Sequence, residues 1–497
     1  MNIKLRKKSS MRDIVVRIYH SKPIFNHRTA WFLLLICFIF AILRIPSLIE
    51  PHWYGDEGIY QVVGRAIDSG RILYKEIWDN KPPVLYLLYA SVYGNLFGIK
   101  LLSLLSGLSS VIVFFMLASK LFKKNKSRYL STICYAFFFG LPILEGNIAS
   151  AENFMFLPTI AAGYFVLRYT EHKKFVFLVF SGLLLAFSFV TKVVAIFDFL
   201  SFFTFLFLVN TGDVKKTLKP MLSYFFIYIS LMVLFACYFF LRGSYGEYLS
   251  SVFFQNISYV GEENHLVFPL GMLLIKTIIL VGAVGFIIFN RKRFNATMLF
   301  LYLWVAFSVY NAFFSERPYT HYLLVALPAV MLLVGHAVEK RKTRIVDVLV
   351  ITVLTLVAFY YFQIYKKTIG YYANYFQFIT NSKNIVEYES FFDSNTPRDY
   401  DIANFIQTNM KGNEKIFLLS DNAQIYALSN KLPIGKYIVA YHITFYKNAD
   451  IITKQQIEKV QPKFIIQTVE DPLLNDLLSS YQLKYIMEGA KIYEREI

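Results

Sequence analysis

Charged residues gather in two short stretches that flank a polar loop of an otherwise apolar sequence. YGDEGIY contains Asp56 and Glu57, and WDNKPPV contains Asp79 and Lys81. Proline is favoured at the first position of a helix but cannot continue a helix that began earlier. Lys81 is therefore predicted to stand just before a helix start. A lysine and several carboxylates at the edge of an apolar segment indicate a site that handles protons and anions.

Further candidate residues occur beside later apolar runs. Glu152 directly precedes one such run, and Lys192 lies between two others. Ionisable residues placed at a membrane edge in this way are functional by default. Arg317, His321 and Tyr322 are spaced i, i+4 and i+5, so they can lie on one side of a helix entrance. Carboxylates can accept a hydroxyl proton, and grouped cations can bind a phosphate that becomes more negative as it leaves.

Each of these residues also has a purely structural interpretation. Asp56 can cap a helix, and Glu57 can stabilise its first turn through the helix dipole. Lys81 can extend along the membrane interface, Glu152 can mark the boundary with water, and Tyr322 can anchor a helix at the interface. Each signal alone is weak, so the functional interpretation depends on the residues occurring together.

The composition is that of an integral membrane protein. The chain has 497 residues, of which 56% are hydrophobic, 18% aromatic and only 17% charged. Soluble proteins carry roughly 25% charged residues. The net charge is +18, but the Lys and Arg residues fall in short clusters between apolar runs. Because there is neither a recognised nucleic-acid-binding fold nor a single basic face, a nucleic-acid partner is not expected.

The cysteines and the N-terminus agree with this class. Cys37, Cys134 and Cys237 all lie inside apolar segments, so no disulfide framework or metal motif is expected. Residues 1–29 are basic and precede a full-length apolar segment without a cleavage site. They are interpreted as a cytoplasmic N-terminus followed by a retained signal anchor.

Apolar segments long enough to cross a bilayer, about 20 residues each, occur about twelve times. The candidates are 30–49, 82–99, 101–121, 128–144, 153–169, 175–191, 193–210, 219–241, 267–289, 296–314, 320–338 and 345–364. If 82–99 crossed, every later basic cluster would lie outside, against the positive-inside rule. We therefore expect 82–99 to be interfacial or re-entrant, which leaves about eleven spans, a cytoplasmic N-terminus and an external C-terminus. All the candidate residues then lie on the extracytoplasmic face.

The predicted fold is an α-helical polytopic membrane protein with a small C-terminal α/β domain. The membrane domain is assigned to 30–364 and the extracytoplasmic domain to 365–497. In the latter, KIFLLS, PKFIIQTV and LKYIM are predicted strands that alternate with helices near 398–411, 452–460 and 471–481. This region contains no nucleophile elbow, phosphate-binding glycine loop or metal cluster motif.

The ordered set of motifs resembles the membrane-bound glycosyltransferases of the C superfamily, in particular family 39-like proteins. These are related to protein O-mannosyltransferases and to the aminoarabinose transferase that modifies lipid A. The resemblance covers about residues 30–340 and is carried by DExxY from Asp56, WDNKPP from Trp78, AEN from Ala151, TK from Thr191 and RxxxHY from Arg317.

The resemblance implies a polyprenyl-phosphate sugar donor and chemistry outside the cytoplasm. It implies that Asp56 is the first-loop catalytic acid with Glu57 beside it, that Lys81 contacts the lipid phosphate, and that Glu152 is the second-loop acid. Asp79 and Asn80 differ from the Glu-Lys-Pro form of the aminoarabinose enzymes, and no β-trefoil insertion is present. The donor sugar and the acceptor therefore stay open.

The sequence thus predicts a hexosyl- or pentosyltransferase that inverts the anomeric configuration. Its acceptor is a lipid, glycan or protein, and a divalent metal ion between carboxylates and phosphate is left open. Asp79 is a candidate for substrate or metal binding. The residues expected to bind the donor phosphate are Lys81, Lys192, Arg317, His321 and Tyr322.

Two other functions compete with this one. A transporter or flippase of a lipid-linked anion would also need cations, but the chain has no internal repeat and its charges gather at one membrane face. An anchored receptor that acts through its C-terminal domain would leave the carboxylates of the first loop unexplained.

Overall fold

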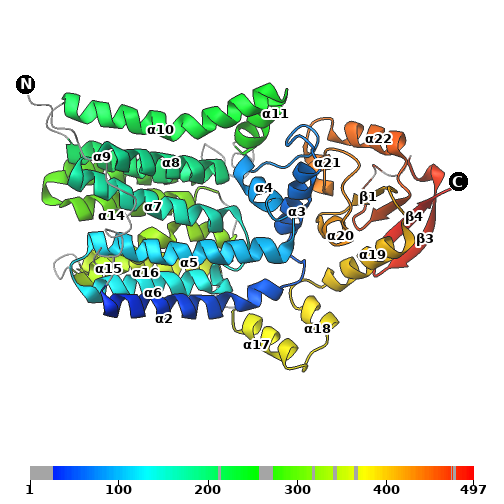
Figure 1. Ribbon diagram of the computed structural model, residues 1–497, viewed down its shortest axis with the longest axis horizontal. Helices are drawn as coiled ribbons and strands as arrows, with labels where there is room; N and C mark the ends of the chain where they lie inside the picture. The colour runs from blue at the N-terminus through cyan, green and yellow to red at the C-terminus, as the bar shows by residue number, and fades with distance from the viewer. Residues whose placement is uncertain are drawn as a thin grey trace, which may run out of the picture.

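The computed structural model describes most of the chain. The described residues are 26–210, 214–256, 272–315, 319–339, 344–362, 368–471, 473 and 477–496. A long helical bundle forms one part of the molecule, and a mixed region of helices and strands forms the opposite end (Figure 1).

The bundle consists of apolar helices that run along the long axis of the molecule (Figure 1). They are α2 (His27–Arg44), α5 (Leu96–Leu121), α6 (Asn125–Gly140), α7 (Ala151–His172), α8 (Phe175–Thr191), α9 (Ile196–Asn210), α10 (Val214–Leu241), α13 (Met272–Phe289), α14 (Ala296–Ala312), α15 (Leu327–Glu339) and α16 (Arg344–Phe362). Short 3₁₀ turns, η1 (Ile45–Ile49), η2 (Pro142–Leu144), η3 (Val193–Ala195), η5 (Arg291–Arg293) and η6 (Thr320–Ala326), extend or join them.

A helix occurs at each segment that was predicted to span the membrane. By length and composition, 5 helices of the described chain can cross a bilayer. They are His27–Ile49, Leu96–Leu121, Val193–Asn210, Thr217–Leu241 and Thr320–Glu339. Shorter apolar helices lie at Phe175–Thr191, Leu273–Phe289, Ala296–Ala312 and Ile345–Val357. The protein is therefore a helical membrane protein, and the predicted number of spans stays a prediction.

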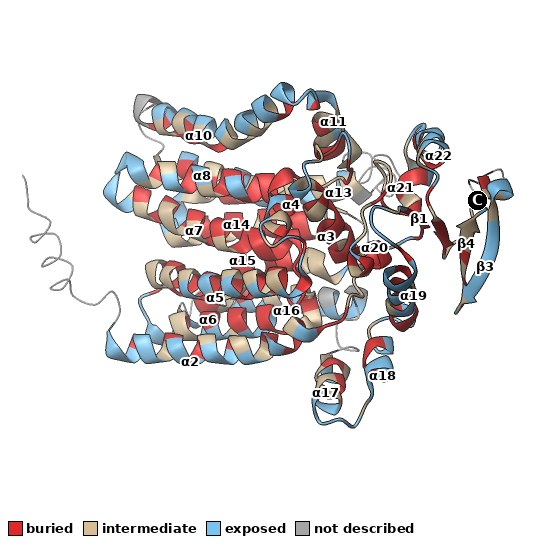
Figure 2. Ribbon diagram, turned by 45° about the vertical axis from the view of Figure 1, so that its right-hand side comes forward, coloured by how far each residue is buried: buried red, intermediate tan, exposed pale blue. Residues whose placement is uncertain are grey.

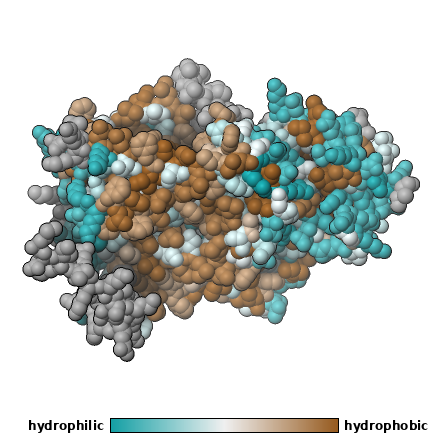
Figure 3. Space-filling model, turned by 45° about the horizontal axis from the view of Figure 1, so that its top comes forward, coloured by the Kyte–Doolittle hydropathy of each residue, from teal (hydrophilic) through white to brown (hydrophobic). Residues whose placement is uncertain are grey.

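The surface of the bundle is apolar. Hydrophobic residues cover its side, whereas hydrophilic residues cover the C-terminal end (Figure 3). Exposed residues run along α2 and α10 on the outside, and buried residues dominate α14 and α15 inside (Figure 2). Trp31 and Phe240, for example, are 60% and 71% exposed. Apolar side chains on the outside of a helical bundle fit a lipid environment.

The segment 82–99 is not one helix. The short helix α4 (Pro83–Ala90) is followed by a turn, and Asn95 then caps α5, which includes residues 96–99. At about 1.5 Å per residue, the 8 residues of α4 are too short to cross the ~30 Å hydrocarbon core. α4 is therefore too short to be a span by itself, and the interfacial or re-entrant placement of 82–99 stays a prediction. The predicted end of this segment at residue 99 is wrong, because the long apolar helix begins earlier.

The C-terminal region contains a four-stranded sheet of order β1-β2-β4-β3. The strands are β1 (Ile416–Leu419), β2 (Phe464–Gln467), β3 (Tyr481–Met487) and β4 (Ala490–Arg495). β1 and β2 are parallel, with Ile416 opposite Phe464, while β4 is antiparallel to both of its neighbours. The helices are α17 (Thr368–Ile379), α18 (Ile385–Ser390), α19 (Thr396–Asn409), α20 (Gln424–Ser429), α21 (Ala440–Phe445) and α22 (Ala449–Val460).

Most of the predicted elements of this region occur. The first three strands and the helices α19 and α22 lie where the sequence placed them, whereas β4 was missed. Of the residues 471–481 that were predicted to be helical, the described ones include the 3₁₀ turn η8 (Leu477–Ser480), and Tyr481 begins β3. Tyr481 is thus the one residue of that predicted helix that belongs to the β3–β4 hairpin.

The C-terminal region packs against the loop that carries Asp56. α3 (Gly55–Asp68) and α4 lie between it and the bundle (Figure 1). Ile59 and Val62 of α3 belong to the same buried cluster as Ile416 of β1. At Gly58, a Cβ atom would lie 2.8 Å from the side chain of Gln424, so α3 and α20 approach at a position that only glycine fits without movement.

Candidate active site

Four segments that are distant in the sequence meet at the end of the bundle that faces α3. Asp56 lies in the first turn of α3, and Glu152 lies in the first turn of α7. Lys192 follows the last residue of α8, and its extended backbone ends that helix. His321 and Tyr322 belong to η6. Helices of the bundle position Glu152, Lys192, His321 and Tyr322. The C-terminal region holds α3, with Asp56, over them.

Lys192 lies at the centre of this group. Its ammonium contacts the Oε1 atom of Glu152 and lies 5.3 Å from the ring centroid of Tyr322. The Nε2 atom of His321 is 3.8 Å from the same Glu152 oxygen. Burial and repulsion by Lys81 lower the pKa of Lys192 to about 7, whereas Asp56 and Glu145 act to raise it. A half-buried lysine that contacts Glu152 and is repelled by a second lysine is prepared to receive an anion.

Glu145, which the sequence did not single out, completes the group. Its Oε2 atom is 2.9 Å from Nδ1 of His321 and accepts a hydrogen bond of 2.8 Å from the Tyr54 hydroxyl. The hydroxyl of Thr320 donates to its other oxygen. Burial acts to raise the pKa of Glu145, but the contacts with His321, Thr320 and Tyr54 lower it to about 2. Glu145 therefore stays ionised and orients His321.

Asp56 is not a helix cap. α3 begins at Gly55, its N-cap is Tyr54, and no side chain makes a capping hydrogen bond there. The capping interpretation of Asp56 is therefore wrong. Its Oδ2 atom instead accepts a hydrogen bond of 2.9 Å from the Tyr60 hydroxyl. Burial and the charge of Asp56 raise the pKa of Tyr60 well above its usual value, so Tyr60 stays a neutral donor that orients the carboxylate.

Lys81 occupies the predicted place before a helix. α4 begins at Pro83 with Pro82 as its N-cap. This confirms the prediction that the two prolines set the start of a helix just after Lys81. The Nζ atom of Lys81 donates to Oδ1 of Asn80 at 2.9 Å. Asp79 is buried and accepts a hydrogen bond of 2.7 Å from the Tyr86 hydroxyl. Burial raises the pKa of Asp79, while Lys81 opposes this and Asp56 adds to it, so Asp79 lies near both.

Glu57 belongs to a separate buried cluster. Its Oε2 atom is 3.1 Å from the ammonium of Lys100 in α5, and its Oε1 atom accepts a hydrogen bond of 2.6 Å from the backbone of Ala149. Lys100 also contacts Glu50 at 2.8 Å, and the hydroxyl of Tyr371 in α17 donates to Glu50. Burial raises the pKa of Glu57, against the pull of Lys100. Glu57 thus joins α3 to α5. Although it is next to Asp56 in sequence, its carboxylate is already bound by Lys100 and by the backbone of Ala149.

Two further predictions from the sequence, the role of Arg317 and a divalent metal ion, are not tested by this geometry. Arg317 lies outside the described residues. Over the part of the chain that the structure describes, no group of three or more His, Cys, Asp and Glu side chains is arranged to hold a metal ion. No ligand set is therefore assigned to the divalent ion that the sequence left open.

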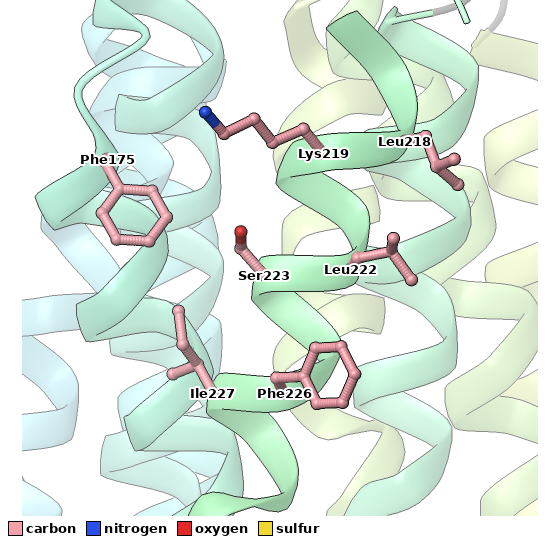
Figure 4. Close-up of a pocket in the computed structure, with 7 residues that line it drawn as sticks. All are labelled: Phe175, Leu218, Lys219, Leu222, Ser223, Phe226 and Ile227. Atoms are coloured by element: carbon pink, nitrogen blue, oxygen red, sulfur yellow. The ribbon is translucent and has the colours of Figure 1, made fainter. Parts of the chain in front are cut away.

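A cavity of about 680 Å³ lies on the bundle between α8 and α10, away from these residues. Lys219, Ser223 and Ile227 of α10 point toward Phe175 of α8 (Figure 4). Phe175 begins α8, whereas Lys192 follows its other end. The mostly apolar lining fits a lipid-facing groove and contributes nothing to the charged group.

The sequence analysis did not select Glu145 or Lys100, although each had a signal in the sequence. Glu145 ends the preceding apolar run in the same loop as Glu152, but only Glu152 directly precedes the next apolar run. Lys100 lies within the apolar helix α5, where an ionisable residue stands out. That signal was lost because the predicted segments 82–99 and 101–121 were divided at Lys100.

Comparisons with known proteins agree with this architecture. Residues 80–239 match the family described as dolichyl-phosphate-mannose-protein mannosyltransferase. No curated protein matches the chain by sequence. Among solved structures, the chain is similar to ArnT from Cupriavidus metallidurans in the apo state, with a TM-score of 0.54 at 13% identity, covering 94% of this chain and 98% of that one. The same enzyme bound to undecaprenyl phosphate gives a TM-score of 0.53 at 13% identity and the same coverage.

A further similar structure is the archaeal oligosaccharyltransferase AglB from Archaeoglobus fulgidus in complex with an inhibitory peptide and a dolichol-phosphate. It has a TM-score of 0.49 at 11% identity and covers 95% of this chain and 74% of that one. The family match and the ArnT fold together confirm that the chain resembles the C-superfamily, family 39-like membrane glycosyltransferases in its matched region and in its fold.

Proposed function

We propose that the protein transfers a sugar from a polyprenyl-phosphate donor to a hydroxyl acceptor on the extracytoplasmic face of the membrane. One observation carries this proposal. The ammonium of Lys192, whose side chain is 12% exposed, contacts the carboxylate of Glu152 and interacts electrostatically with Lys81, Asp56 and Glu145. This supports a base and a phosphate-binding group near each other at the end of an apolar bundle, where a lipid-linked phosphate would enter.

Asp56 acts as the base. The acceptor hydroxyl gives its proton to the Asp56 carboxylate while its oxygen forms a bond to the anomeric carbon of the sugar. The bond between that carbon and the phosphate oxygen breaks, and its electron pair leaves with the lipid phosphate. A single displacement of this kind inverts the anomeric configuration. Asp56 then releases its proton to water.

Lys81, Lys192 and His321 stabilise the departing phosphate. Preorganised donors that face a developing charge in a water-poor site contribute a large part of such catalysis. Glu152 and Glu145 hold Lys192 and His321 in place, and Tyr322 covers the lysine ammonium. Arg317 joins this group as a proposed phosphate ligand. Asp79 positions the first loop through Tyr86. Glu57 is a positioning residue, because Lys100 and Ala149 already bind its carboxylate.

The decisive experiment measures the transfer of a radiolabelled sugar from a polyprenyl-phosphate donor, in membranes that contain the wild type or Asp56→Asn. Sugar transfer that depends on Asp56 supports the proposal. Movement of the lipid-linked sugar across the membrane without cleavage of the sugar–phosphate bond would instead identify a flippase. The identity of the sugar, hexosyl or pentosyl, follows from the donor that is consumed.

A further inference from the structure

A polar cleft of about 470 Å³ opens between the first loop, α11 (Tyr245–Leu249) with the residues that follow it, and the C-terminal region. The residues around it include aromatic, hydroxyl and charged side chains, among them Trp78, Glu247, Ser251, Lys436, Tyr437 and Lys447. Because three separate segments build the cleft, it exists only when the C-terminal region is docked on the membrane domain.

Trp78 forms a fixed wall of this cleft. Its backbone N–H donates to the carbonyl of Lys436 at 3.0 Å, and its indole N–H donates to Oγ of Ser251 at 2.7 Å. Its ring also packs against His442 and Tyr446, with centroids 4.8 and 4.3 Å away. The tryptophan therefore ties the C-terminal region to the segment after α11. Trp78 is only 2% exposed, so it fixes the wall of the cleft, and the face that remains for a ligand belongs to Tyr437, which is half-buried.

The charge of the cleft is positive. Lys436 and Lys447 outnumber the one acid among the lining residues, Glu247. The ammonium of Lys436 lies 5.8 Å from the ring centroid of Tyr437, so a cation and an aromatic face occur side by side. This combination favours a ligand that carries both a negative group and a sugar ring.

The cleft adjoins the proposed reaction centre. Trp78 is followed by Asp79, which interacts electrostatically with Asp56. Lys81 interacts with Lys192 on one side and with His442, behind Trp78, on the other. The same loop therefore contributes to the wall of the cleft and to the group that receives the donor phosphate.

We propose that this cleft binds the acceptor, and that the acceptor is an anionic saccharide, a sugar that carries a phosphate or carboxylate group. The assignment rests on the proposed transferase function and names the substrate class of the same site. Lys436 and Lys447 bind the anionic group, and Tyr437 packs on the sugar ring. A hydroxyl of that acceptor then supplies the oxygen that bonds to the anomeric carbon and the proton that passes to Asp56.

The test is calorimetric titration of the full chain in detergent with glucose 6-phosphate, glucose and inorganic phosphate. Glucose 6-phosphate is expected to bind about tenfold more tightly than either other probe, because only it offers both groups. Lys436→Glu with Lys447→Glu should weaken its binding by about tenfold or more. Lys459→Glu is the matched control, an exposed lysine of α22 outside the cleft, and should bind as the wild type does.

Undecaprenyl phosphate binding separates the two proposals. The double variant should bind this lipid as the wild type does, which also shows that it is folded. If it does not, Lys436→Met with Lys447→Met takes its place, since it removes charge without adding repulsion. Unchanged glucose 6-phosphate binding in a folded double variant overturns the acceptor site, as does equal binding of glucose or inorganic phosphate. Failure of the wild type to bind undecaprenyl phosphate overturns the proposed function itself.

Discussion

The ammonium of Lys192, at the end of α8, is in contact with the carboxylate of Glu152, at the start of α7. Forty residues of chain separate them. The pair places a cation at the end of the bundle with its counter-charge already fixed by a helix start. An arriving phosphate would compete with Glu152 for that cation. The ammonium of Lys192 could then exchange the carboxylate for the phosphate while it stays at the end of the bundle.

Asp56→Asn should fold and bind the donor normally, because Asn preserves the size of the side chain and can still accept from Tyr60. We expect sugar transfer to fall by roughly two to four orders of magnitude, the usual span for the loss of a positioned base. The measurement is radiolabelled transfer at saturating donor. Tyr60→Phe is the companion variant and should lose less, since it removes only the group that orients the carboxylate. Near-normal turnover of Asp56→Asn would remove Asp56 from the chemistry.

Lys81→Met keeps the long apolar stem and removes only the charge. A lost charge-assisted contact lowers binding roughly ten- to over a hundredfold, and we expect that loss in the affinity for undecaprenyl phosphate. Lys75→Met is the matched control, because Lys75 lies in the same loop but is exposed and donates to the carbonyl of Gly243. Equal affinities for the two variants would contradict a phosphate-binding role for Lys81.

Donor binding should depend on pH through Lys192. Burial and the charge of Lys81 lower its pKa to about 7, while contact with Glu152 favours the charged form. The protonated form is the one that binds phosphate and is the form lost as pH rises, so affinity should fall above about pH 7. Lys192→Arg keeps its charge across this range and should flatten the profile. A wild-type affinity that is constant from pH 6 to 9 would contradict the assignment.

Lys100→Met should destabilise the protein strongly. It removes the cation that contacts both Glu50 and Glu57 and leaves them with only the electrostatic interaction of Arg44, and the breaking of a buried ion pair typically costs about 3–5 kcal/mol. Thermal unfolding in detergent should show a lowered melting temperature. Adding Glu50→Gln and Glu57→Gln removes the uncompensated charges and should restore part of the stability. If sugar transfer recovers together with stability in that triple variant, Glu57 contributes only by positioning α3 against α5. If stability recovers but sugar transfer does not, the charge of Glu57 is also needed for the reaction.

The topology can be tested with single cysteines in a background in which the three native cysteines are replaced by serine. Lys126→Cys should react with a membrane-impermeant reagent only from the cytoplasm, and Lys411→Cys only from outside. Both lysines are exposed, whereas Ser127 beside the first is buried and would label poorly. Labelling of both positions from the same side would overturn the one-sided arrangement of the active site.

Local features of the fold could be predicted from the sequence because they depend on neighbours in the chain. Hydropathy placed a helix at every predicted span, and the two prolines placed the start of α4 at Pro83. Alternating apolar runs located β1, β2 and β3. The candidates Asp56, Glu152, Lys192 and His321 could be chosen because each stands at the edge of an apolar segment.

Only the tertiary structure decided which of these residues meet. Glu145 reaches His321, and Glu50 and Glu57 share Lys100, through contacts between segments that the chain separates widely. The docking of the C-terminal region on α3 likewise depends on packing between distant segments, whereas Asp56 and Tyr60 are i, i+4 neighbours within α3. A sequence determines where charge and apolar surface lie along each helix, but the pairing of buried charges follows from the packing that removes water from them.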